Sequence, residues 1–367
     1  MSVSAKGIAT AIQTAVPVHL IGGPGVGKTA ATKQLAEAVG RHLQTFIASV
    51  HEPSDIGGLP FAVDDRYFRM LAGPIVKGIA DQHEKGVSSI LFLDEISTAP
   101  PAMQAGCLRL VHERVVGDET LPADTWIILC SNPTDTSAGT YMLSAALANR
   151  MLHITWEVNH ERWIEGMLSG WDPNGGIDVL PANWKDLIPG AKATAASFIR
   201  HKPALLYSPP KDNEAAGRAW PSPRTWEMAA TIMAACRAAE LSKDDELGLV
   251  AGLIGEGASI EYLTWERALD LPDPKEALEN ADTIKLPKRG DQVFTMLTTV
   301  VQYAKTHLSE RYWSAAWVLL GRASDEGHAD LATMPARMLG LARTSKLLIP
   351  KEVRKFAALF QAAGLLK

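Results

Sequence analysis

The sequence predicts a layered α/β domain followed by an all-helical region. Three observations predict this class. Short apolar runs alternate with helical patterns up to residue 158, a glycine-rich turn follows the first run, and strand-like runs stop after residue 158. This alternation is typical of a mostly parallel sheet covered by helices, because strands buried on both faces form continuous apolar segments.

Five runs in the first part are short, rich in β-branched or aromatic residues, and bounded by turn residues. We expect them to form five buried strands, over residues 16–21, 44–50, 89–94, 126–131 and 152–158. Helical patterns lie between them, most clearly over residues 29–41 and 101–113. A strand that alternates with a helix in this way builds a sheet with helices on both faces.

Beyond residue 158 only helical patterns remain, so we expect a helical segment over residues 159–265 and a C-terminal helical extension over 266–367. The expected helices cover residues 160–169, 194–201, 224–241, 244–254, 292–308, 311–321 and 351–363. Polar connectors over residues 171–190 and 202–223 interrupt the first of these segments, and the second connector contains five prolines.

Composition excludes several classes of protein. With 367 residues, of which 47% are hydrophobic and 21% charged, the chain can bury a full core. Its net charge of -5 argues against a protein that coats nucleic acid, although a local basic patch stays open. The N-terminus lacks the pattern of a signal peptide and no apolar stretch is long enough for a membrane span, so we expect a cytoplasmic protein with no membrane partner.

Cysteine usage excludes a disulfide scaffold and a cysteine-held zinc site, and the histidine pattern argues against a histidine-held one. The three cysteines are an odd number without a CxxC pair, which fits a reducing cytosol. The ten histidines are scattered and form no HExxH motif, so a protein-held zinc site is not expected.

The glycine-rich turn fits the pattern G-x-x-x-x-G-K-[ST] at every position. The residues of this pattern are Gly22, Gly23, Pro24, Gly25, Val26, Gly27, Lys28 and Thr29, and we add the next residue, Ala30, to the expected nucleotide-binding residues. Glycines let such a loop curl so that backbone N–H groups point at a triphosphate, to which the helix N-terminus adds its positive end. Lys28 can reach the β- and γ-phosphates, and the Thr29 hydroxyl can ligate Mg²⁺. The alternative is a strand-helix turn without a ligand.

Two further strands end in polar residues that suit the same chemistry. Asp94 and Glu95 end the run at residues 89–94, where Asp94 can hold the magnesium and Glu95 can polarise the attacking water. Two adjacent acids can also simply start a helix. Asn132 follows the run at residues 126–131 and can contact the water or the γ-phosphate, but an Asn-Pro pair is also an ordinary turn initiator.

This sequence resembles the AAA+ ATPases in the order of its motifs, which are Lys28, Asp94-Glu95 and Asn132 on alternating strands. Further segments resemble the MoxR branch of that family. The segment that ends in Asn149-Arg150-Met151 is similar to the one that carries the arginine finger, usually read as Asp-Arg-Phe. Ser222-Pro223-Arg224 looks like the sensor-2 motif at the start of a lid helix. Three more segments resemble parts of the MoxR branch. Residues 53–57 resemble its loop after the second strand, residues 73–75 its turn before the acidic strand, and residues 111–126 its hairpin before the position of Asn132.

The resemblance implies an AAA+ P-loop αβα sandwich over residues 1–158, with a five-stranded, mostly parallel sheet. It implies a helical lid with sensor 2 over 159–265, and it covers residues up to about 240. It also implies that ATP and Mg²⁺ are the cofactors and that the protein is a homo-oligomer, usually a hexameric ring. Each nucleotide then lies between two subunits, with Arg150 supplied by the neighbour, whereas the subunit that Arg224 serves stays open.

The resemblance favours an Mg²⁺-dependent ATPase that remodels or matures a partner protein, often together with a von Willebrand A-domain protein. Three alternatives stay open. The chain can be a nucleic-acid translocase or restriction-type motor, although nucleic acid is disfavoured by its charge. It can also be a chelatase-like subunit for metal insertion, or a nucleotide-gated scaffold whose turnover is incidental.

Overall fold

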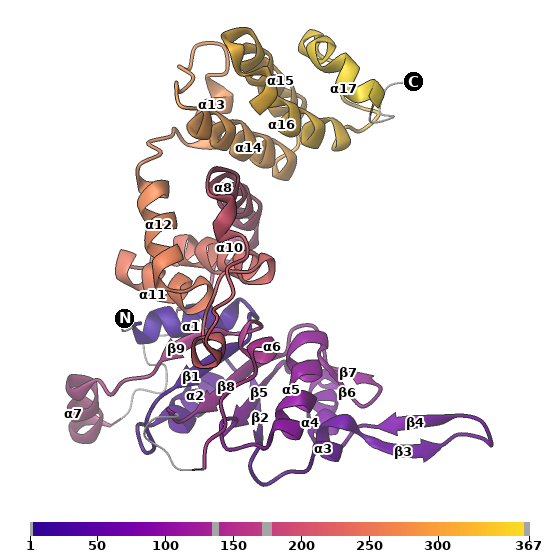
Figure 1. Ribbon diagram of the computed structural model, residues 1–367, viewed down its shortest axis with the longest axis vertical. Helices are drawn as coiled ribbons and strands as arrows, with labels where there is room; N and C mark the ends of the chain where they lie inside the picture. Colours follow the sequence, from indigo (N-terminus) through magenta and orange to yellow (C-terminus); the bar gives the residue numbers. More distant parts are fainter. Residues whose placement is uncertain (1–2, 134–138, 171–177, 363–367) are drawn as a thin grey trace. The chain divides into compact units, whose positions relative to one another are not determined.

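The computed structural model describes residues 3–133, 139–170 and 178–362 (Figure 1). It contains two compact units. The first combines Met1–Ala182 with Tyr207–Ile260, and the second combines Asn183–Leu206 with Glu261–Lys367. The three-way division expected from the sequence, into residues 1–158, 159–265 and 266–367, stays a prediction.

A five-stranded parallel sheet forms the centre of the first unit, as predicted. Its spatial order is β2-β5-β8-β1-β9, and every neighbouring pair runs parallel. The strands are β1 (Val18–Ile21), β2 (His42–Ile47), β5 (Ser89–Asp94), β8 (Trp126–Ser131) and β9 (Leu152–Thr155). β5 and β8 are buried almost throughout, which explains their unbroken apolar sequences.

Helices of the first unit begin and end at residues with the expected chemistry. α10 (Pro223–Ala238), for example, begins with Ser222 as its N-cap and Pro223 in its first turn, and the Ser222 hydroxyl accepts a hydrogen bond from the Thr225 N–H. The other helices of this unit are α1 (Ala5–Gln13), α2 (Lys28–Ala38), α3 (Pro53–Gly57), α4 (Pro74–Glu84), α5 (Pro101–Glu113), α6 (Ala145–Ala148), α7 (His160–Ser169), α9 (Asn213–Ala216) and α11 (Lys243–Ile254).

A two-stranded ribbon was not predicted. β3 (Leu59–Ala62) pairs with β4 (Phe68–Leu71) between α3 and α4, and Figure 1 shows the ribbon extending away from the sheet. It exposes large apolar side chains to solvent: Leu59, Phe61, Tyr67 and Phe68 are each at least 60% exposed. A second hairpin, β6 (Val115–Val116) with β7 (Glu119–Thr120), confirms the hairpin expected before Asn132.

The second unit is helical, as expected for the C-terminal part of the chain. α14 (Gly290–Thr306) packs against four other helices of this unit, which are α8 (Ile188–His201), α13 (Pro274–Glu279), α15 (Glu310–Ala323) and α16 (Ala329–Leu341). Shorter elements are η1 (Trp184–Leu187), η2 (Pro203–Leu205), η3 (Ser324–His328), η4 (Lys351–Phe356) and α17 (Ala357–Ala362). α12 (Glu256–Arg267) contains the unit boundary. Among the helices described, none combines the length and apolarity that a membrane crossing requires.

Element bounds differ from the predictions mainly at chain turns. The last predicted strand ends at Thr155 instead of residue 158, because the Trp156 N–H makes a final bond to the Ile21 carbonyl and its indole then turns to the Val26 carbonyl. Residues 53–57, expected as a loop, form the short helix α3. The predicted helices over residues 101–113 and 160–169 match α5 and α7 from end to end.

Close contact between α11 and β9 generates a stability prediction. A Cβ added at Gly252 would lie 2.1 Å from the His153 carbonyl oxygen, so Gly252→Ala must displace backbone. We expect it to lower the free energy of unfolding by about 1–3 kcal/mol or more, measured by chemical denaturation. Gly257→Ala is the control, because nothing lies within 4 Å of a Cβ there. The control should be neutral or stabilising by up to about 1 kcal/mol. Equal effects of the two substitutions on the free energy of unfolding would contradict the close packing of α11 on β9.

Candidate functional site

The glycine-rich loop leaves β1 and enters α2 in the predicted place. Gly25 and Gly27 have φ values of 76° and 88°, a region that suits glycine because a Cβ would be strained there. Gly27 is the N-cap of α2 and offers no side chain to its N–H groups. These donors therefore stay available to an anion, at the end of the helix where its dipole is positive.

Trp156 holds this loop from the neighbouring strand, which the sequence reasoning missed. Its indole N–H donates to the Val26 carbonyl at 3.0 Å. Its own carbonyl lies so near Gly22 that a Cβ there would be 2.6 Å away, so only glycine fits at this position. The available signal was a tryptophan near the end of the predicted strand at residues 152–158.

Lys28 lies at the centre of the site. Its ammonium donates to the carbonyls of Gly22 and Gly23, at 2.6 and 2.9 Å, and to Asn132 Oδ1 at 3.1 Å. Burial lowers the pKa of Lys28 below its ordinary value, while the Asp94 carboxylate acts in the opposite direction. The ammonium is thus bonded to neutral oxygens and no carboxylate is among these partners, so its charge remains available to a phosphate.

Thr29 and Asp94 meet at the edge of the loop. The Thr29 hydroxyl donates to Asp94 Oδ2 at 3.0 Å, and the Glu95 N–H donates to Asp94 Oδ1 at 2.9 Å. A hydroxyl and a carboxylate are ligands that suit Mg²⁺, which keeps several waters and is usually bound through one or two protein groups plus substrate phosphates. Within residues 3–133, 139–170 and 178–362, no group of three or more His, Cys, Asp or Glu side chains forms a metal cage. The residues present therefore fit an Mg²⁺ that arrives with a nucleotide.

Glu95 has an unusual backbone for a non-glycine residue, with a φ of 57°. This conformation is costly and persists where surrounding contacts enforce it, often at functional sites. The Ser49 hydroxyl donates a short hydrogen bond to the Glu95 carboxylate from the segment after β2. Ser49 was not predicted. A hydroxyl just beyond the strand that neighbours β5 was the signal, because β2 and β5 run parallel and end at the same edge.

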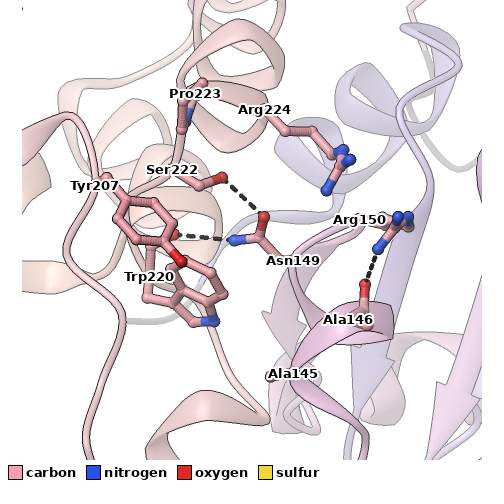
Figure 2. A pocket seen from close by; sticks show the side chains of 9 residues that line it. All are labelled: Ala145, Ala146, Asn149, Arg150, Tyr207, Trp220, Ser222, Pro223 and Arg224. Carbon is pink, nitrogen blue, oxygen red and sulfur yellow. Dashed lines mark hydrogen bonds between the residues drawn. The ribbon is translucent and has the colours of Figure 1, made fainter.

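Arg150 and Arg224 line one pocket, a cavity of about 450 Å³ (Figure 2). The remaining lining residues are Ala145, Ala146, Asn149, Tyr207, Trp220, Ser222 and Pro223, and no residue of the glycine-rich loop is among them. The Arg150 guanidinium donates to the Ala146 carbonyl, while its buried Nε has no hydrogen-bond partner among the described residues. Two guanidinium groups in one partly buried pocket have the charge and the hydrogen-bond donors that suit an anion.

Electrostatics at this pocket agree with two neighbouring positive charges that repel each other. Burial lowers the pKa of Arg150, and the charge of Arg224 lowers it further, although Glu113 acts in the opposite direction. Burial also lowers the pKa of His112, followed by the charges of Arg150 and Arg224. Each effect disfavours a further cation, so a bound anion would relieve the repulsion.

Asn149 joins the segment that carries Arg150 to the helix that carries Arg224. Its Oδ1 accepts a hydrogen bond from the Ser222 hydroxyl at 2.8 Å, and its Nδ2 donates to the Trp220 carbonyl at 3.4 Å (Figure 2). An aspartate, which the resembling family usually has here, carries no donor for the Trp220 carbonyl at neutral pH. The asparagine therefore suits this pocket by offering both a donor and an acceptor.

The structure thus separates the predicted residues into two groups. Lys28, Thr29, Asp94, Glu95 and Asn132 gather with the glycine-rich loop at the carboxyl ends of β1, β5 and β8. Arg150 and Arg224 gather in the separate pocket. The catalytic roles of all seven residues stay predictions.

Comparison with known proteins agrees with this geometry. Residues 18–153 match the model of a family described as ATPase family associated with various cellular activities (AAA). This segment contains β1, β2, β5 and β8 and reaches into β9, and its parallel sheet with covering helices is the AAA fold. A search of curated proteins found no match.

Among solved structures, the chain is similar to the crystal structure of a proposed ATPase from Cytophaga hutchinsonii. The two chains are 17% identical, and the match covers 72% of this chain and 88% of the other, with a TM-score of 0.43.

The link through Asn149 can be tested by its removal. Asn149→Ala leaves the buried Ser222 hydroxyl and Trp220 carbonyl with fewer partners, so we expect the free energy of unfolding to fall by about 1–3 kcal/mol in chemical denaturation. Asn213→Ala, at an exposed position of α9, is the matched control and should change stability by less than about 0.5 kcal/mol. A harmless Asn149→Ala would show that the two arginine-bearing segments are held together by other contacts.

Proposed function

We propose that this chain is an Mg²⁺-dependent ATPase of the MoxR type, which assembles into a ring and uses hydrolysis to remodel a partner protein. One observation carries the hydrolytic part. The Lys28 ammonium lies 3.1 Å from Asn132 Oδ1, and the Thr29 hydroxyl lies 3.0 Å from Asp94 Oδ2, at the start of a helix whose N-cap, Gly27, offers no side chain to its N–H groups. This is a cation, an amide, a hydroxyl and a carboxylate at one helix N-terminus, as phosphoryl transfer requires.

Each residue of this group has a distinct role in the proposal. Loop N–H groups and Lys28 bind the phosphates, and Thr29 and Asp94 hold the Mg²⁺, which when bound supplies charge neutralisation at the phosphates. Glu95 accepts a proton from the attacking water. To do so, its carboxylate exchanges the Ser49 hydroxyl for the water. Asn132 orients the water or the γ-phosphate and reports on its presence.

Arg150 and Arg224 serve the neighbouring subunit in this proposal. They line one pocket together, and that pocket contains no residue of the glycine-rich loop. Two cations with room for an anion, on a surface apart from their own phosphate loop, support the idea that both complete a site supplied by another copy. Hydrolysis then depends on assembly, because spreading charge in the transition state requires these cations. A hexameric, cytosolic ring follows from the family resemblance alone.

A protein client is favoured over nucleic acid by the surface of the first unit. The β3–β4 ribbon exposes Leu59, Phe61, Tyr67 and Phe68, and large exposed apolar side chains are typical of protein contacts. A phosphate backbone instead requires dense positive charge, while the chain carries a net charge of -5. A von Willebrand A-domain partner and a chelatase-like role rest on family resemblance alone.

Two substitutions separate binding from hydrolysis. We expect Lys28→Ala to abolish binding of Mg-ATP in calorimetry, because the loop loses its only ammonium. Glu95→Gln should keep that binding and lower the hydrolysis rate by at least about 100-fold, since the general base is lost. Glu84→Gln, an exposed position at the end of α4, is the control and should leave both unchanged. Undiminished hydrolysis by Glu95→Gln would reject the assigned base.

Mixed assemblies test whether the arginines act between subunits. Lys28→Ala and Arg150→Ala subunits, each inactive alone, are mixed in equal amounts and the hydrolysis rate is measured. Random assembly pairs an intact loop with an intact arginine at about a quarter of the interfaces, so about a quarter of the wild-type rate should return. We expect the same recovery when Arg224→Ala replaces Arg150→Ala. No recovery in either mixture would place the arginines in their own subunit's site or in a structural role.

The nucleic-acid motor is tested by adding DNA. If the proposed role is right, DNA should leave the hydrolysis rate unchanged at both low and moderate salt. A stimulation by DNA that falls steeply with salt concentration would instead favour the motor and reject the protein-remodelling role.

A further inference from the structure

A chain of buried polar groups crosses three neighbouring strands of the sheet. The Ser131 hydroxyl at the end of β8 lies 2.8 Å from His19 Nε2 on β1, and His19 Nδ1 lies 3.1 Å from His153 Nδ1 on β9. His153 Nε2 then contacts the Ala148 carbonyl at 2.9 Å. The side chains of this chain, which we call the histidine relay, are buried: Ser131, His19 and His153 are 5%, 2% and 9% exposed.

The last contact of the histidine relay fixes every proton in it. A carbonyl only accepts, so His153 Nε2 carries a hydrogen and neutral His153 has a bare Nδ1. His19 must therefore donate from Nδ1, which leaves its Nε2 bare and makes the Ser131 hydroxyl the donor to it. All three bonds point in one direction, from Ser131 to Ala148, and each ring nitrogen has one partner.

Burial, together with neighbouring positive groups, keeps both histidine rings neutral. Burial holds the pKa of His153 at about 4, and the charge of Arg218 also disfavours protonation, although the bond to Ala148 acts in the opposite direction. Burial, His153 and Lys28 together hold the pKa of His19 well below its ordinary value. A second proton on His153 would place two N–H groups against each other at the 3.1 Å contact, whereas one on His19 Nε2 would reverse the hydrogen bond to the Ser131 hydroxyl, so the single direction of the relay requires both rings to be neutral.

The two ends of the relay lie beside the two groups of predicted catalytic residues. At one end, Ser131 precedes Asn132, and its carbonyl accepts from the Gly22 N–H at 3.2 Å. At the other end, the Ala148 carbonyl also accepts from the Met151 N–H at 3.3 Å, which closes the turn that carries Arg150. The Ser131 end is fixed in the centre of the sheet, whereas the Arg150 turn follows a helix of only four residues, α6.

We propose that His19 and His153 are positioning residues that hold the Arg150 turn in a geometry set by the Asn132 strand. This inference rests on the proposed ATPase function. Two histidines in the middle of an apolar sheet require hydrogen bonds that aliphatic side chains would not, so their presence is not explained by stability alone. Because the relay is a directional chain in series, loss of any one bond removes its restraint on the turn, while the bonds of Asn149 remain.

Kinetics of relay variants test this series behaviour. Ser131→Ala, His19→Phe and His153→Phe should each lower kcat by roughly 3- to 30-fold, while the Kd for Mg-ATP stays within about twofold. The double variant His19→Phe/His153→Phe should equal a single variant, because a broken chain cannot be broken again. Multiplying losses, or losses in Mg-ATP affinity in place of kcat, would overturn the relay in favour of a general packing role.

Polar substitutions keep the test valid if the phenylalanine variants do not fold. His153→Asn keeps an acceptor for His19 and loses Ala148, whereas His153→Gln keeps a donor for Ala148 and loses His19. Both should show the same reduced kcat, and wild-type kcat in either would overturn the relay. Thr125→Val is the matched control, since Thr125 is equally buried beside the opposite end of β8 and its hydroxyl has no partner among the described residues. It should keep wild-type kcat.

Mixed assemblies show on which side the relay acts. His153→Phe subunits mixed with Lys28→Ala subunits should recover hydrolysis, because intact loops then meet intact arginines. Mixed with Arg150→Ala subunits they should not recover, since neither copy supplies a well-placed arginine. The reverse pattern would overturn the inference by assigning the defect to the loop.

A folded wild type without hydrolysis rejects the proposed function and the relay together, whereas an active wild type with unaffected relay variants rejects the relay alone.

Discussion

The position of β1 between β8 and β9 is the constraint on which the rest of this structure depends. Parallel strands end at the same edge, so the glycine-rich loop after β1 lies beside Asn132 on one side and beside Trp156 on the other. Its glycines provide the curl, but neighbouring strands hold it: Asn132 contacts Lys28, and the Trp156 indole contacts Val26. These contacts restrain the loop independently of any phosphate, and preorganised donors of this kind act on developing charge.

Polar contacts in this unit are concentrated where segments of different roles meet. Asn149 joins the Arg150 segment to the N-cap of α10, and the histidine relay joins the same segment to β8. Buried polar groups are tolerated when each is satisfied, and a satisfied network specifies one arrangement more strictly than apolar packing does. The Arg150 turn, which follows a very short helix, is the segment that gains most from this restraint.

The two groups of charged residues differ in how far each is complete. At the glycine-rich loop the Lys28 ammonium already bonds to the Asn132 amide oxygen, and the Thr29 hydroxyl already bonds to the Asp94 carboxylate. The Arg150–Arg224 pocket contains two cations whose charges repel, with a buried Nε that lacks a partner among the described residues. The first group has the composition of a phosphate and magnesium site, and the second has two cations with room for an anion. This asymmetry underlies the proposed assembly of several copies.

Local patterns in the sequence determined the five strands, the phosphate loop and the acids at the end of β5. Apolar runs and turn chemistry act over a few residues, so they can be read without knowing what lies opposite. Only the tertiary structure decided that Ser49 contacts Glu95, that Trp156 clamps the loop, and that Arg150 and Arg224 share a pocket. His19 and His153 are 134 residues apart, and they meet because β1 and β9 pair in a register that places them side by side. Register between distant strands is set by the packing of the whole sheet, and no short segment of the chain contains it.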